Sequence, residues 1–66
     1  MQVKYFEDTD TTLLEFSNTP PVETQEFNEN IYIDLDGEGH VVSVTIEHAS
    51  QSANMGEFLY QRIPAV

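Results

Sequence analysis

The sequence predicts an α+β, mostly β fold: a small antiparallel β-meander of about four strands with one short C-terminal helix. Three observations predict it. Apolar and polar residues alternate with the period of a strand up to Glu47, an Asp-Gly turn separates the two clearest runs, and apolar residues at helical spacing follow. The 66 residues form one small domain, 1–66, with the sheet expected over about 2–47 and the helix over about 51–62.

The first half of the chain predicts a hairpin followed by a break. Val3–Phe6 is rich in aromatic and branched residues, and a polar turn separates it from a second such run, Thr12–Phe16. Pro20 and Pro21 lack backbone donors, so no central strand can continue through them. The next stretch, 22–27, alternates weakly and is predicted to be an edge strand or an extended linker.

The central hairpin is the clearest element. Ile31–Leu35 places three apolar residues on one face, and 40–46 repeats this alternation. Asp36-Gly37 between them is a strong signal for a tight hairpin turn.

A change of period after Glu47 predicts the helix. Ser50 or Ser52 can cap its start, and Met55, Phe58 and Leu59 follow at helical spacing. Gly56 weakens such a helix, and Pro64 ends it.

Charge and cysteine content limit the function. Twelve acidic residues face two basic ones, for a formal net charge of −10. Such a chain repels nucleic acid and anionic membranes, so we expect no direct binding to either. It favours a basic protein partner, divalent cations or simple solubility. The absence of cysteine excludes disulfides and thiolate metal sites, which leaves oligomerisation, for instance a homodimer, as a source of stability.

No stretch approaches the ~20 apolar residues of a membrane span. No basic and apolar signal segment precedes the predicted sheet. We therefore expect a cytoplasmic protein.

The segment Asp34–Gly39 resembles the opening of a calcium-binding loop, with oxygen-bearing residues at positions one, three and five and glycine at six. Position twelve is Thr45, where a bidentate Glu is required. The sequence thus favours a hairpin turn, with divalent-cation binding as the alternative.

His40 and His48 stand at the two ends of one predicted strand, about 26 Å apart at ~3.3 Å per residue. They cannot share a metal within one chain. We interpret them as structural or surface residues, the alternative being a metal site shared across a dimer interface. No cofactor site and no metal site is predicted.

Nothing in the sequence indicates catalysis. No serine stands in a nucleophile elbow or a Ser-x-x-Lys arrangement, and no glycine-rich loop precedes a helix. Paired carboxylates would need a cleft, which a thin sheet of this size rarely forms. We predict a non-enzymatic protein without catalytic residues.

Several motifs carry a family resemblance. These are the run Val3–Ser17 with its Asp-Thr-Asp-Thr-Thr-Leu-Leu-Glu-Phe-Ser, Glu23-Thr24, Ile31–Asp36 with its Asp-x-Asp, and Gly39–Ser50 with its closing Ala-Ser. Together they resemble the small bacterial family catalogued as domain of unknown function 2283, over roughly residues 3 to 50. Phe6 and Ser43 depart from the family pattern, which commonly has Asp and Gly there, and the segment from Gln51 is less typical.

The resemblance implies a small antiparallel sheet with a helix and offers no catalytic residues to transfer. It also implies, for some members, an antitoxin role toward a small toxin encoded beside them. We therefore predict an acidic binding module, antitoxin-like, that neutralises a basic toxin partner. The alternative is a homo-oligomeric structural or regulatory protein. The residues predicted to contact the partner are Glu15, Glu23, Glu26, Tyr32 and Glu47.

Overall fold

Five strands form one antiparallel sheet in the computed structural model, which describes residues 1–65. The strands are β1 (Gln2–Phe6), β2 (Thr11–Glu15), β3 (Glu23–Asn28), β4 (Ile31–Leu35) and β5 (Val41–Ile46), and a 3-10 turn, η1 (Ala49–Gln51), follows. The mostly β class is confirmed. The stretch predicted as edge strand or linker is the edge strand β3, so the sheet has five strands instead of about four.

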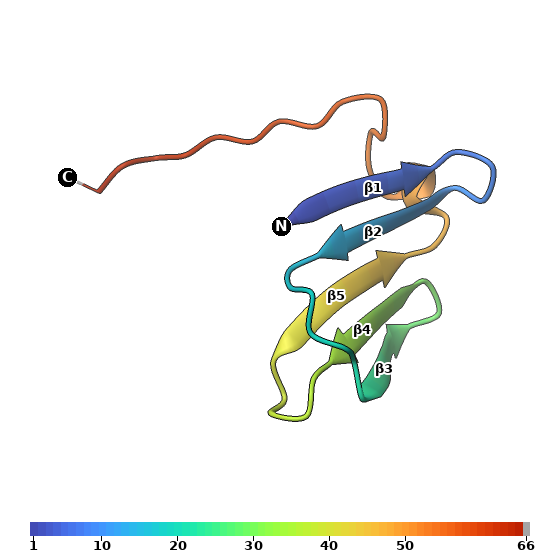
Figure 1. The fold of residues 1–66 in the computed structure, drawn as a ribbon. Helices are drawn as coiled ribbons and strands as arrows, with labels where there is room; N and C mark the ends of the chain where they lie inside the picture. Colours follow the sequence, from blue (N-terminus) through green and yellow to red (C-terminus); the bar gives the residue numbers. More distant parts are fainter. Residues whose placement is uncertain (66) are drawn as a thin grey trace.

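The strand order β1-β2-β5-β4-β3 corrects the predicted meander. β5 inserts between β2 and β4, so the chain leaves β2, passes the ends of two strands and enters the sheet at its far edge (Figure 1). This is a Greek-key order. Two features favour it: Pro20 and Pro21 prevent a tight turn after β2, and β5 has no charged residue, which suits a central strand.

The predicted helix over 51–62 is wrong: in residues 52–65 the chain forms no helix. Helical geometry is confined to the three residues of η1. The Asn54 side chain accepts a hydrogen bond from the backbone N–H of Gly56 at 3.0 Å. This local bond competes with the backbone hydrogen bond that the Gly56 N–H would donate in a helix. Most of the segment is also exposed, so no packed layer supports a helix there.

The strand register gives the sheet one apolar and one polar face. Residues paired across neighbouring strands point to the same side, so each row of partners crosses the sheet on one face. The apolar face has the rows Val3–Leu14–Val44–Ile33 and Tyr5–Thr12–Ile46–Ile31. The polar face has the rows Lys4–Leu13–Thr45–Tyr32–Glu26 and Gln2–Glu15–Ser43–Asp34–Thr24.

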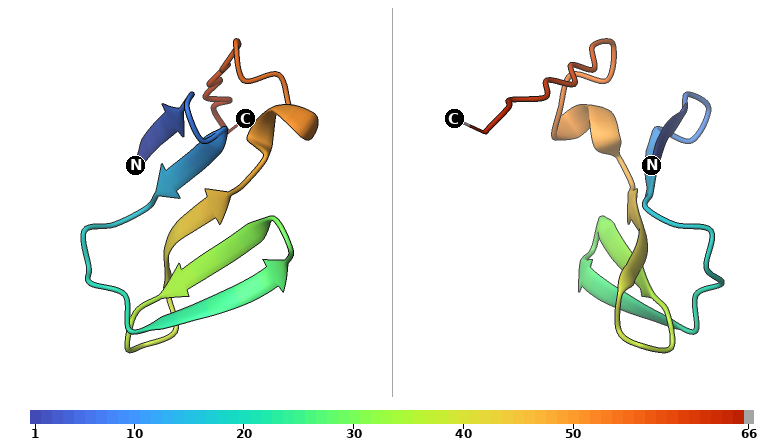
Figure 2. Two further views of the ribbon diagram at one scale, coloured as in Figure 1. Left: turned by 90° about the vertical axis from the view of Figure 1, so that its right-hand side faces the viewer. Right: turned by 60° about the vertical axis from the view of Figure 1, so that its left-hand side comes forward.

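Each face is covered at one end only. η1 and the residues after it lie over the apolar face beside β1, β2 and β5, while the connection 16–22 lies on the opposite side of the sheet (Figure 2). Among residues 1–65, the hydrophobic side chains that are buried are Val42, 6% exposed, and Ala49, 1% exposed. The core is therefore thin, as expected for so short a chain.

A hydrogen-bonded clasp centred on Asp10 attaches η1 to the β1–β2 turn. The Asp10 carboxylate accepts the Tyr5 hydroxyl at 2.6 Å, the Ser50 hydroxyl at 2.7 Å and the Ser50 backbone N–H at 3.1 Å. Its carbonyl oxygen accepts the Ala49 N–H at 2.9 Å. Asp10 and His48 both have a φ of 53°, a left-handed conformation that turns the chain back onto the sheet.

Candidate partner-binding surface

Three of the predicted contact residues gather at one end of the polar face. Glu26 of β3 lies directly opposite Tyr32 of β4. The charge of Glu47, and to a smaller extent burial and the charge of Glu26, raises the pKa of the Tyr32 hydroxyl above its ordinary value. Both carboxylates therefore lie close enough to the Tyr32 hydroxyl to disfavour its ionisation. We call Glu26, Tyr32 and Glu47 the acidic rim.

The other two predicted contact residues lie elsewhere. Glu15 is on the polar face, but its carboxylate forms an ion pair with Lys4 at 2.7 Å. Its charge is thus already matched within the chain. Glu23 is opposite Leu35 at the edge strand β3, in a row of the apolar face, and accepts the Gln25 amide at 2.8 Å. Neither belongs to the acidic rim.

Asp34 joins three strands on the polar face. Its two carboxylate oxygens accept the hydroxyls of Thr24 on β3 at 2.5 Å and Ser43 on β5 at 2.8 Å. The sequence assigned Asp34 to a segment that favours a hairpin turn, with cation binding as the alternative, and did not indicate these contacts. Its actual partners lie opposite it in the sheet, so they could be found only once the strand pairing was known.

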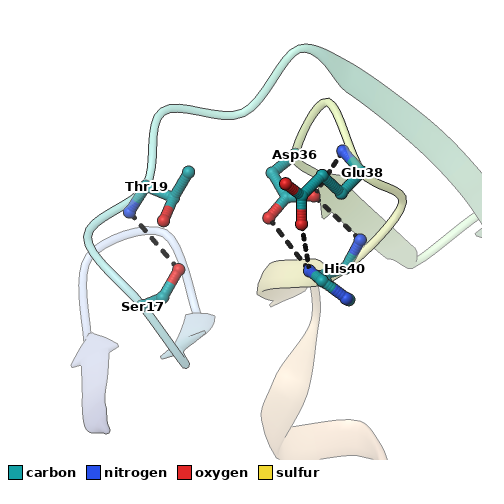
Figure 3. Close-up of polar contacts among 5 residues, drawn as sticks. All are labelled: Ser17, Thr19, Asp36, Glu38 and His40. Carbon is teal, nitrogen blue, oxygen red and sulfur yellow. Dashed lines mark hydrogen bonds and ion pairs between the residues drawn. The ribbon is translucent and has the colours of Figure 1, made fainter.

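Asp36 closes the β4–β5 hairpin from inside the turn (Figure 3). Its Oδ1 accepts the backbone N–H groups of Glu38 and His40, both at 2.9 Å. These bonds, that from His40 foremost, hold the pKa of the Asp36 carboxyl below its ordinary value. The carboxylates of Asp34 and Asp36 therefore serve separate structural contacts. No group of three or more His, Asp or Glu side chains in residues 1–65 is arranged to hold a metal ion.

The two histidines occupy opposite ends of β5, as the spacing predicts. The imidazole of His40 is mostly exposed and lies 3.5 Å from the Asp36 carboxylate and 3.6 Å from that of Glu38. His48 adopts the left-handed conformation just before η1. Both positions are turns, where these residues shape or cover the end of a strand.

An apolar groove that the sequence analysis missed lies on the other face. It has a volume of about 440 Å³ and runs between the sheet and the segment 52–58. Its floor is formed by Val3, Tyr5, Thr12, Leu14 and Ile46. A second hollow of about 490 Å³ continues past Val3 and Phe58 and is lined by these two residues with Met1 and Tyr60. The sequence signal for this groove was the spacing of Val3 and Tyr5, which lie two positions apart in a strand and therefore on the same face.

Residues 58–65, which we call the tail, begin with Phe58 at the end of the groove and extend away from the sheet past β1 (Figure 1). Four large apolar side chains on it are exposed: Phe58 at 65%, Leu59 at 82%, Tyr60 at 72% and Ile63 at 79%. A compact monomer of this mass exposes about 4,250 Å². This chain exposes 5381 Å², roughly 1,100 Å² more than that scaling. The excess exceeds the ~800 Å² that each partner buries in a standard interface.

Fold and surface define a one-layer, acidic antiparallel sheet with an uncovered apolar segment. The family model described as protein of unknown function (DUF2283) matches residues 2–50, most of the chain. The chain therefore belongs to this family, which confirms the resemblance noted from its motifs. The match includes all five strands and the Ser50 end of the clasp, and it ends before the groove segment and the tail.

No curated protein and no solved structure matches the chain. In residues 1–65, the only helical segment is a single short turn, and no helix has the length and apolarity to cross a membrane.

Proposed function

We propose that this protein is a non-enzymatic, acidic binding module that docks onto a basic protein, in the manner of an antitoxin covering its toxin. The observation that carries the proposal is the gathering of the Glu26 and Glu47 carboxylates around Tyr32, on a chain with a net charge of −10. An acidic surface of this kind is suited to a cationic partner.

The acidic rim is the contact that orients the partner. Glu26 and Glu47 create a negative potential around Tyr32, whose ring adds apolar area between two charges. Tyrosine is enriched in protein interfaces, where its ring gives contact area, and charges at the rim of an interface steer the encounter. A basic partner would bring arginine or lysine side chains to this end of the polar face.

Co-expression with the protein encoded next to this chain tests the proposal. We expect a complex that survives size exclusion at low salt and weakens as salt rises, because screening removes the attraction between opposite charges. Absence of a complex at low salt would contradict the proposal.

A matched pair of variants locates the contact. Glu26→Gln/Glu47→Gln removes two charges from the acidic rim. Glu38→Gln/Glu57→Gln removes two exposed charges away from it, one in the β4–β5 turn at the other end of the sheet and one beside the groove on the opposite face. We expect the first variant to slow association roughly tenfold or more and the second to change it far less. Equal effects of the two variants would show that net charge alone drives binding and that the acidic rim is not the contact.

A further inference from the structure

The two edges of the sheet differ sharply in their protection against pairing. β3 has Glu23 and Glu26, and a bulge interrupts its register between Glu26 and Asn28. Unpaired charges and bulges on an edge strand prevent another strand from adding to it. β1 has no bulge and no acidic residue: its five residues pair with β2 without interruption, and its one charge, Lys4, is matched by Glu15 at 2.7 Å. β1 is therefore the open edge of this sheet.

The apolar surface gathers at this same edge. Val3 and Phe58 line both the groove and the second hollow. Met1 and Tyr60 complete the lining of the second hollow. All four side chains are exposed. A strand added beside β1 would extend the apolar face and cover these residues.

We infer that β1 is the site where a second copy of this chain adds, antiparallel, to form one continuous ten-stranded sheet across a two-fold axis. A register centred on Val3 pairs Gln2 of one copy with Lys4 of the other, which keeps the two lysines apart. Each Lys4 already forms an ion pair with Glu15 of its own chain, so this register brings no unmatched charge to the two-fold axis. The exposed surplus of roughly 1,100 Å² is enough for a stable dimer, which buries ~800 Å² per chain.

The charge of the chain selects this edge for self-association. Two copies at −10 repel each other everywhere except where acidic residues are absent. Of the two edge strands, only β1 combines that absence with a cation, Lys4. Screening of the remaining repulsion must strengthen the dimer as salt rises. Binding of a basic partner to the acidic rim has the opposite salt dependence, so the two associations are separable.

Light scattering and amide hydrogen exchange on the full chain test the inference. From about 1 µM to about 1 mM, the range of moderate to weak affinities, the mass should rise from 7.5 kDa toward twice that value, at lower protein concentration when salt is added. Amides of Gln2–Phe6 that point away from β2 should gain protection over the same range, while those of Glu23–Asn28 should not. A monomer throughout, or a dimer that protects β3 instead, overturns it.

Val3→Glu tests the proposed β1–β1 contact by mutation, because it places two like charges on the two-fold axis. Val22→Glu is the matched control: it adds the same charge at an exposed site beside the other edge strand. We expect the first change to weaken the dimer at least a hundredfold and the second to leave it within about threefold. A folded Val3→Glu protein that still dimerises refutes the inference. If circular dichroism shows that this variant is unfolded, the exchange pattern of the natural chain decides alone.

Discussion

Gly37 and Gly39 stand two residues apart in the β4–β5 turn, yet only Gly39 requires glycine. Gly39 has a φ of +83°, and nothing lies within 4 Å of a Cβ atom added at either position. Steric space is therefore equal at the two sites, and backbone conformation is the only difference. A left-handed conformation disfavours any residue with a Cβ atom.

We expect Gly39→Ala to lower the free energy of unfolding by about 1 kcal/mol, because alanine is strained at positive φ. Gly37→Ala should leave it unchanged or raise it by about 0.5 kcal/mol, because alanine reduces the freedom of the unfolded chain. Urea unfolding of the two variants measures the difference. Equal destabilisation by both changes would contradict the assignment.

Asp10 makes the clasp sensitive to pH. Hydrogen bonds from Tyr5 and Ser50 hold the pKa of the Asp10 carboxyl below its ordinary value. The bond between Tyr5 and Asp10 also raises the pKa of the Tyr5 hydroxyl. A lowered carboxyl pKa gives stability that is present above the unfolded value of about 4 and is lost as pH falls through the folded value. A raised phenol pKa gives stability that is present below about 10 and is lost as pH rises through the folded value.

Asp10→Asn isolates the acid limb of this dependence. Asparagine tolerates the left-handed backbone and can still accept hydrogen bonds, but it does not titrate. We expect the melting temperature of the natural chain to fall more steeply than that of the variant between about pH 5 and pH 2. Tyr5→Phe should in turn flatten the alkaline limb. Parallel acid limbs in the natural chain and Asp10→Asn would show that other carboxyls dominate.

At the scale of elements, the tail should be dispensable for the fold. Truncation after Glu57 removes the tail, whose residues 58–65 are exposed and form no strand. We expect it to change the free energy of unfolding by less than about 0.5 kcal/mol in dilute solution, where the chain is monomeric. Val42→Ala, which opens a cavity at a buried position, should lower it by about 2 kcal/mol. A truncated chain as unstable as Val42→Ala would mean that the tail packs on the sheet in solution.

The strands were predictable because their signals are local. Alternation in Ile31–Leu35 and the Asp36-Gly37 turn lie within a few residues of each other, and the observed β4 has the predicted bounds. The pairing of β2 with β5 joins residues about 30 positions apart, and many strand orders satisfy the same alternation. The helical spacing of Met55, Phe58 and Leu59 misled because Phe58 and Leu59 stay exposed, at 65% and 82%, so no apolar stripe packs on the sheet to support a helix.

The candidate surface was predictable only in part, for the same reason. Acidity and an outward Tyr32 follow from the sequence, and two of the predicted glutamates lie beside that tyrosine. The ion pair that neutralises Glu15 depends on Lys4 reaching diagonally across the β1–β2 pair. The open edge at β1 depends on which strands end up central, which the sequence leaves undetermined.

The whole molecule is a single layer with its charge and its apolar surface on different regions. The acidic rim lies toward β3 on the polar face, while the groove and the hollow lie toward β1 on the apolar face. The proposed basic partner and the proposed second copy would therefore contact different residues. The extents of 39 × 33 × 19 Å describe a plate, and a plate offers two faces and two edges to other molecules.

The Greek-key order also determines when each strand of the nascent chain can pair with its neighbours. β1 and β2 are synthesised first, but β2 lacks its inner neighbour until β5 has been made, about 30 residues later. At typical elongation rates this is a wait of roughly 2–6 s, during which an isolated two-stranded hairpin is only marginally stable. The hairpin with the open edge is thus the part of the protein that stays unprotected longest during synthesis. β4 pairs with β3, and β5 with β4, directly after each is made, so these strands need no such delay.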